Sequence, residues 1–123
     1  MKLYNSVGPN PKVVRMFMAE LGLELEQQKI DIMKGENRQA AYLEVNPGGQ
    51  LPALELDSGM VISEITAICE YLDDSQGHTS LIGTTVDERA ETRMWVRRID
   101  LGIAENLASG FRSSEGMEMF KDR

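Results

Sequence analysis

The sequence has few of the residues that build metal centres and disulfide frameworks. Its 123 residues include one cysteine, Cys69, and one histidine, His78. A single cysteine excludes an intrachain disulfide and fits a reducing, cytoplasmic compartment, and with one histidine it leaves no cluster of zinc ligands. The absence of a Cys-x-x-Cys pair excludes redox chemistry by the chain's own thiols. We therefore expect a cytoplasmic protein without a metal site.

Basic residues and long apolar runs are also scarce. Lys and Arg number 13 against 20 Asp and Glu, which gives a formal net charge of −7. This acidic surplus argues against nucleic acid as a partner, because a phosphate backbone is bound by Lys and Arg. No apolar run approaches the roughly 18 residues that a membrane-spanning helix needs. We therefore expect neither nucleic acid nor membrane as a partner.

The first 75 residues alternate between short strands and amphipathic helices. The pattern predicts, in order, a strand at 2–5, a helix from Pro11 with Asn10 as N-cap, a strand at 27–32, a helix at 38–45, a hairpin of strands at 53–56 and 60–62, and a helix after Ser63 as N-cap. In the last helix, Ile65, Ile68, Cys69 and Leu72 form one apolar stripe. This order predicts an α/β fold, a small mixed sheet with helices packed on its faces.

The composition changes after residue 75. Residues 76–85 are rich in Gly, Ser and Thr, as a linker is, and residues 86–110 have the wide apolar stripe of one long helix. We expect Trp95 and Cys69 to be core residues rather than site residues. A single wide-faced helix cannot bury itself, so residues 86–123 are expected to be the first helices of an all-helical domain that this chain begins without completing, or to be covered by a partner chain.

Polar residues lie where the first strand meets the first helix. Ser6 and Asn10 flank the loop at the carboxyl end of that strand, where sheet proteins of this order bind ligands. The free N–H groups of a helix N-terminus favour an anion, and a thiolate carried by a ligand would suit them. The alternatives are that Asn10 is a plain helix cap and Ser6 a turn residue.

Two further segments have features of a binding site. If the Leu51–Pro52 bond is cis, the backbone N–H and C=O of Leu51 can pair with an extended, peptide-like ligand; the alternative is a trans proline at a strand start. Glu64 can pair with an ammonium group, or it stabilises its own helix. A thiolate site, a backbone-pairing site and an amino-acid clamp together match the three groups of glutathione.

Several segments resemble a bacterial cytosolic glutathione S-transferase. They are the opening Met-Lys-Leu-Tyr, the loop ending Pro9-Asn10-Pro11, the string Asn-Pro-Gly-Gly-Gln-Leu-Pro-Ala-Leu at 46–54, and Ser-Glu-Ile-Thr-Ala-Ile-Cys-Glu-Tyr-Leu at 63–72. The resemblance implies a thioredoxin-like glutathione-binding domain over residues 1–75, a linker over 76–85, and the first helices of an all-α domain over 86–123. It also implies a cis-proline at Pro52 and glutathione contacts from Gln50, Leu51 and Glu64.

The sequence departs from the family at two positions. Ile65 stands where the family usually has a serine that binds the γ-glutamyl carboxylate, so Ser63, Thr66 or the helix N–H groups would have to compensate. At the catalytic position, Asn10 places the chain nearer to the nu-class enzymes and the fungal nitrogen-regulator relatives. An amide stabilises a thiolate but is no general base, and we rank Asn10 first and Ser6 second as thiolate stabiliser.

The resemblance implies a transferase that binds glutathione as co-substrate and transfers its thiolate to a small, electrophilic, apolar compound. The alternative is a non-catalytic module of the same fold used for protein association, as in translation-factor relatives. The sequence does not distinguish conjugation from a disulfide-reducing or peroxidase role with bound glutathione. Family members are usually dimers, so a homodimer is also expected.

Overall fold

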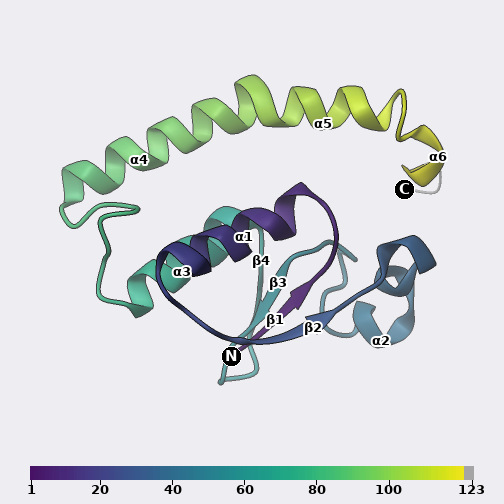
Figure 1. Cartoon of the computed structure of the whole chain (residues 1–123), viewed down its shortest axis with the longest axis horizontal. Coiled ribbons are helices and arrows are strands. Elements are labelled where there is room, and N and C mark those ends of the chain that lie inside the picture. The colour runs from purple at the N-terminus through teal and green to yellow at the C-terminus, as the bar shows by residue number, and fades with distance from the viewer. Residues whose placement is uncertain (121–123) are drawn as a thin grey trace. The chain divides into compact units, whose positions relative to one another are not determined.

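Residues 1–77 fold around a four-stranded sheet in the computed structural model, which describes residues 1–120 (Figure 1). The strands are β1 (Lys2–Asn5), β2 (Glu26–Lys29), β3 (Ala53–Glu55) and β4 (Val61–Ser63). The helices are α1 (Pro9–Glu20), the 3-10 turns Ile32–Lys34 and Glu36–Arg38, α2 (Ala40–Leu43) and α3 (Ile65–Ser75). The element order confirms the predicted α/β class.

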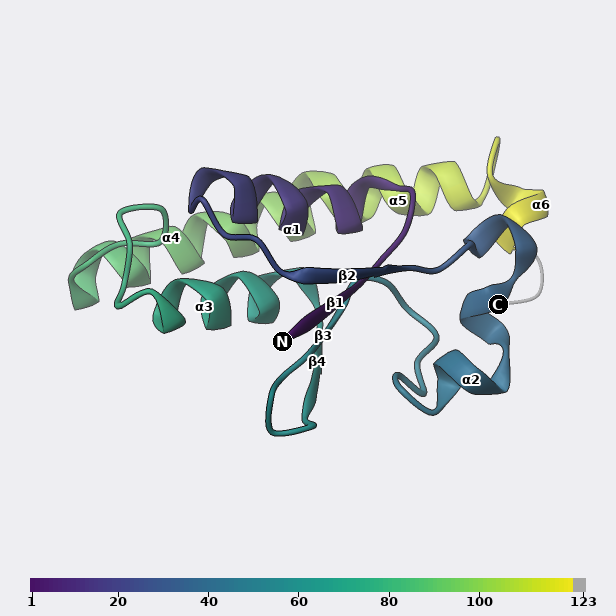
Figure 2. The ribbon, with the colours of Figure 1, turned by 60° about the horizontal axis from the view of Figure 1, so that its bottom comes forward.

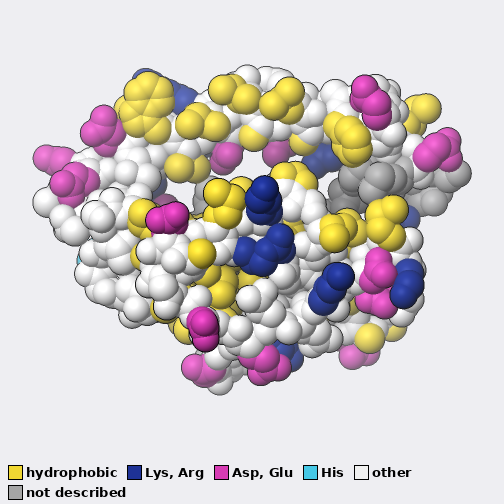
Figure 3. All heavy atoms as spheres, in the orientation of Figure 1, with side chains coloured by type: hydrophobic (Ala, Val, Ile, Leu, Met, Phe, Trp, Pro, Cys, Tyr) yellow, Lys and Arg dark blue, Asp and Glu magenta, His cyan; other side chains and the backbone are white. Residues whose placement is uncertain are grey.

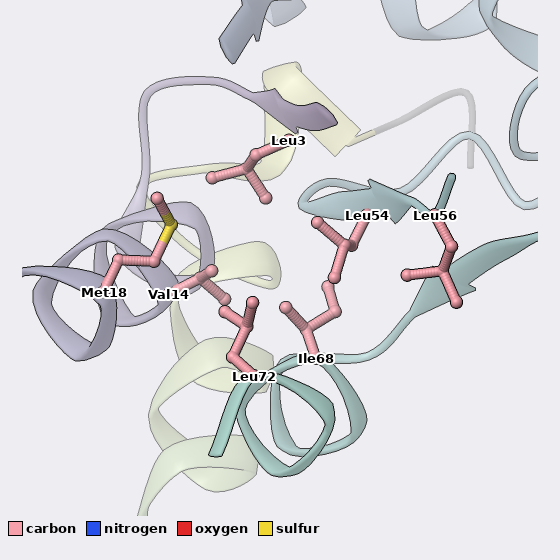
Figure 4. Packing of buried hydrophobic residues seen from close by; sticks show 7 residues of the cluster. All are labelled: Leu3, Val14, Met18, Leu54, Leu56, Ile68 and Leu72. Carbon is pink, nitrogen blue, oxygen red and sulfur yellow. The ribbon is translucent and has the colours of Figure 1, made fainter. Parts of the chain in front are cut away.

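The strand order is β2-β1-β3-β4, with β1 parallel to β2 and the other neighbours antiparallel. Successive residues of a strand point to opposite faces, and the core divides accordingly. Leu3 and Leu54 pack with α1 and α3 in one cluster, whose buried members are Leu3, Val14, Met18, Leu54, Leu56, Ile68 and Leu72 (Figure 4). Tyr4 and Ala53 pack with Ile30 and with Tyr42 of α2 on the other face. The sheet therefore lies between α1 and α3 on one face and α2 on the other, and Figure 2 shows α2 well apart from α1 and α3.

Several predicted boundaries are wrong by a few residues. Helix α1 begins at Pro9 and its N-cap is Gly8, so Asn10 is the second helical residue and not the cap. The φ of Gly8 is 116°, a conformation open to glycine, and Pro9 supplies a φ suited to the first helical position. Ser63 is the last residue of β4, and Glu64 is the N-cap of α3.

The strand predicted at 27–32 instead spans Glu26–Lys29, because the Asp31 side chain accepts hydrogen bonds from the N–H groups of Met33 and Lys34 and starts a 3-10 turn. The helix predicted at 38–45 is shorter, and its first residues belong to a 3-10 turn.

The second unit begins at His78 and is helical. It contains α4 (Val86–Ile99), a π-helical stretch at Asp100–Ala104, α5 (Glu105–Arg112) and α6 (Met117–Phe120). Thr85 and Glu88 form a capping box at the start of α4. The helical course predicted for 86–110 is thus present, with five residues wound more widely.

The expectation that Trp95 is a core residue is wrong, because Trp95 is 51% exposed. Helices α4 and α5 follow one another along a single course, and such a course cannot cover its own apolar stripe. Figure 3 shows hydrophobic side chains along this course. Ile103 and Leu107, which belong to it, are also exposed. None of the helices within residues 1–120 is long and apolar enough to cross a membrane.

Candidate functional site

The register of the sheet brings the predicted site segments to one end of it. Tyr4 of β1 pairs with Ala53 of β3, and Ala53 pairs with Ser63 of β4. Because β3 runs antiparallel to both neighbours, the next row consists of the residue after Tyr4, the residue before Ala53 and the residue after Ser63. The β1–α1 loop, the Leu51–Pro52 bond and Glu64 therefore meet at the same end of the sheet.

The Leu51–Pro52 bond is cis, as the resemblance implied. Pro52 is buried, Leu51 is half-buried and Gln50 is exposed. Among the backbone hydrogen bonds of residues 1–120, none involves the N–H or the C=O of Leu51. The peptide groups of this residue are thus available to an extended ligand at the end of β3.

Three buried side chains hold the two carbonyls that precede Leu51. The Tyr42 hydroxyl and the Asn46 amide both donate to the Gln50 oxygen, at 2.6 and 2.9 Å. The Asn37 amide donates to the Gly49 oxygen at 2.9 Å. Burial raises the pKa of Tyr42 to about 12, so its hydroxyl stays a donor across the ordinary pH range. Sequence reasoning missed these residues; the available signal was a set of Asn and Tyr side chains just before the proline string.

The β1–α1 loop is held by hydrogen bonds to the interior of the domain. Ser6 is 4% exposed, and its hydroxyl donates to the Ile30 carbonyl oxygen at 2.6 Å. The Arg15 guanidinium donates to the Ser6 carbonyl oxygen at 3.0 Å and to the Asn5 side chain. A serine hydroxyl has one proton to donate. The Ser6 proton therefore serves the interior of the domain.

Asn10 lies exposed in the first turn of α1, beside the same loop. Pro9 and Pro11 have no N–H, so Asn10 provides the sole backbone N–H among the first three residues of this helix. The anion-binding capacity expected of this helix N-terminus is consequently reduced to the N–H and the side-chain amide of Asn10, together with the loop before it.

Glu64 is exposed and has a φ of 72°, a left-handed conformation that is rare for residues other than glycine. As the N-cap of α3 it stands beside the free N–H groups of the first turn, and its carbonyl accepts from Ile68 at 3.0 Å. Holding a non-glycine residue in such a conformation costs on the order of 1–3 kcal/mol, and strain of this kind clusters at functional sites.

The side chains of Ile65 and Cys69 face the core. Both are half-buried and pack against the main cluster, the one that contains Leu3 and Leu72. Burial raises the pKa of the Cys69 thiol to about 11, which keeps it protonated and unreactive at neutral pH. The Ile65 side chain therefore serves the packing of the domain, and the expectation that Cys69 is a core residue agrees with its packing.

Residues 1–74 match the family model of the glutathione S-transferase N-terminal domain. The chain is 36% identical over 106 residues to Glutathione S-transferase 2 of Saccharomyces cerevisiae, covering 85% of this chain and 46% of that protein. It is 39% identical over 104 residues to Protein LigF of a Sphingobium species, covering 81% and 40%. A solved glutathione S-transferase domain-containing protein of Marinobacter aquaeolei is 36% identical, with a TM-score of 0.84 over 91% of this chain and 56% of the other. The chain spans about half the length of the curated relatives it matches.

Proposed function

Because the chain belongs to the glutathione S-transferase family, we propose that its first domain binds glutathione and presents the thiolate to a small, electrophilic, apolar co-substrate. The observation that carries this proposal is the meeting of three segments at one end of the sheet, through the row formed by Tyr4, Ala53 and Ser63. Each segment offers a different chemical group, and glutathione has a matching partner for each.

The middle of the ligand pairs with the backbone of Leu51. The Leu51 N–H can donate to the carbonyl of the cysteinyl unit, and the Leu51 C=O can accept from its N–H. The ligand then pairs like a strand added to a sheet edge. The exposed Gln50 side chain lies next to this unit and is assigned a further contact with the ligand. Pro52 has no N–H and serves to shape this turn.

The γ-glutamyl end of the ligand is assigned to the start of α3. The Glu64 carboxylate pairs with the ammonium group, and the N–H groups of Ile65 and Thr66 donate hydrogen bonds to the ligand's carboxylate. Since Ile65 has no hydroxyl to offer, the carboxylate relies on backbone donors. The strained φ of Glu64 supports this assignment, because it directs the residue away from ordinary strand or helix geometry.

The thiolate is assigned to Asn10 rather than to Ser6, whose proton is donated to Ile30. The Asn10 amide donates a hydrogen bond to the sulfur and lowers the pKa of the bound thiol. The sulfur then uses a lone pair to form a C–S bond with the electrophilic carbon, and the leaving group departs with the electrons of its own bond. A net charge of −7 does not steer an anionic ligand, so binding rests on these local groups.

Titration calorimetry of the chain with reduced glutathione tests the proposal. We expect binding at millimolar or lower concentration, and no heat at high ligand concentration would instead favour the non-catalytic, protein-associating module. In the Asn10→Ala variant the pKa of the bound thiol should rise by about one unit. A pH titration that monitors the ultraviolet absorbance of the thiolate measures this pKa. Met16→Ala, at another exposed position of α1, should leave that pKa unchanged.

We also include a homodimer in the proposal. Exposed apolar side chains on α4 and α5, among them Trp95 and Leu107, support it because a large exposed apolar patch usually marks an interaction surface. Sedimentation velocity of the chain should give a mass near twice 13.8 kDa, and a purely monomeric chain would contradict this part.

A further inference from the structure

The peptide unit that joins Gln50 to Leu51 is anchored through its carbonyl oxygen. Two side chains from the α2 region donate to that oxygen, the Tyr42 hydroxyl at 2.6 Å and the Asn46 amide at 2.9 Å. Two donors occupy both lone pairs of one carbonyl oxygen. Its direction is therefore fixed by the interior of the domain.

Fixing the carbonyl also fixes the N–H of Leu51. The cis bond among residues 1–120 is Leu51–Pro52, so the Gln50–Leu51 unit is trans, and its C=O and N–H point in opposite directions in one plane. When the oxygen is held from inside, the Leu51 N–H must face away from Tyr42 and Asn46. Hydrogen bonds to the oxygen also polarise the amide and make its N–H a stronger donor.

From this geometry we infer that Tyr42 and Asn46 are positioning residues that aim the Leu51 N–H at the ligand and strengthen it as a donor. The inference rests on the proposed binding of glutathione through Leu51. Neither side chain needs to touch the ligand, since each acts through a single peptide plane.

Both anchors are themselves held rigidly. Tyr42 is 3% exposed, and its ring meets that of Tyr4 edge-on at 5.8 Å. Asn46 is 8% exposed, and its side-chain oxygen accepts from the Gly48 N–H at 3.2 Å, which orients its amide toward Gln50. Asn37 holds the preceding carbonyl, that of Gly49. The segment is consequently pre-organised before any ligand arrives, and the ligand does not have to order it.

The Tyr42→Phe variant tests the inference, because it keeps the ring and removes one donor. We expect the Kd for glutathione to rise about fivefold. Tyr71→Phe is the matched control, because the Tyr71 ring packs against the main cluster and its hydroxyl takes part in none of the hydrogen bonds described for residues 1–120. This variant should bind glutathione with the Kd of the unmodified chain. Asn46→Ala removes the second donor and should act in the same direction, so it serves if Tyr42→Phe does not fold.

A second ligand separates positioning from general damage. In a reduced-amide analogue of glutathione the cysteinyl C=O is replaced by CH2, so the Leu51 N–H has no acceptor. The unmodified chain and Tyr42→Phe should then bind the analogue equally. An equal loss of affinity for glutathione and for the analogue would overturn the inference, because it would mean that Tyr42 only supports the fold.

The unliganded chain provides a readout that does not depend on glutathione. Loss of a hydrogen bond to the Gln50 oxygen should move the Leu51 amide resonance of Tyr42→Phe upfield in nitrogen-15 NMR, with no shift in Tyr71→Phe. A chain that binds no glutathione yet shows this shift would refute the proposed function and keep the positioning role. An unmoved Leu51 resonance would overturn the positioning role itself.

Discussion

Replacing Ser6 by alanine separates the two roles that a serine can have in the β1–α1 loop. The residue is 4% exposed, and its hydroxyl donates to the Ile30 carbonyl oxygen at 2.6 Å. Ile30 is itself buried, at 6% exposure. The variant therefore leaves a buried carbonyl with one partner fewer, and a loss of this kind costs about 1–3 kcal/mol. We expect the free energy of unfolding to fall by about 2 kcal/mol.

Urea denaturation measures this change, with Ser58→Ala as the matched control. Ser58 is exposed in the hairpin turn, and its hydroxyl accepts from Met60 at 3.4 Å, so its loss should change stability by less than about 0.5 kcal/mol. For a small domain, 2 kcal/mol corresponds to a fall in Tm of about 8–16 °C. The pKa of bound glutathione should stay the same in Ser6→Ala, because the lost proton faced Ile30 and not the ligand.

The opposite pattern would refute this reasoning. A Ser6→Ala variant with unchanged urea midpoint and a raised thiol pKa would show that the hydroxyl faces the sulfur. The assignment of the thiolate to Asn10 would then be wrong.

Further expected outcomes concern Leu72, Glu64 and Cys69. Leu72→Ala should lower the free energy of unfolding by about 2–5 kcal/mol in urea, because Leu72 is fully buried in the main cluster, and an unchanged midpoint would contradict that packing. Glu64→Gly should relieve the strain at φ 72° and raise the free energy of unfolding by about 1 kcal/mol, while calorimetry should show weaker glutathione binding. A variant that is both more stable and a tighter glutathione binder would show that Glu64 is not part of the site. Cys69, with a pKa of about 11 against an ordinary 9.0, should react with iodoacetamide at pH 8 about a hundredfold more slowly in the folded than in the urea-unfolded chain. The same shift makes the folded state hold the thiol proton more tightly, so stability should fall as the pH rises from about 9 to 11.

Local patterns in the sequence predicted most elements of the first domain. Apolar spacing in α3, the Asp57–Gly59 turn and the glycines and prolines between elements act within a few residues of the chain, and such short-range signals can be read without a structure. The boundaries that were wrong depend on interactions a pattern does not show. Asp31, for example, ends β2 by accepting two backbone hydrogen bonds.

The sequence predicted which residues belong to the candidate site better than it predicted what each of them does. Leu51, Pro52 and Glu64 stood out through a proline at a strand start and an acidic residue at a helix start. The sequence offered both Ser6 and Asn10 as thiolate stabilisers and the family resemblance ranked Asn10 first, but neither showed where the two side chains point. The direction of the Ser6 hydroxyl, toward Ile30, depends on a residue 24 positions away.

The sequence by itself determined the order of the elements, the family and the residue types at the site, because these depend on local propensity and on strings of neighbouring residues. The tertiary structure decided which groups face a ligand. The pairing of Tyr4, Ala53 and Ser63 assembles the site, and the Tyr42 and Asn46 bonds to Gln50 set the direction of the Leu51 N–H. Hydrogen bonds between distant segments act only after the chain has folded, and for that reason the pattern along the chain could not reveal them.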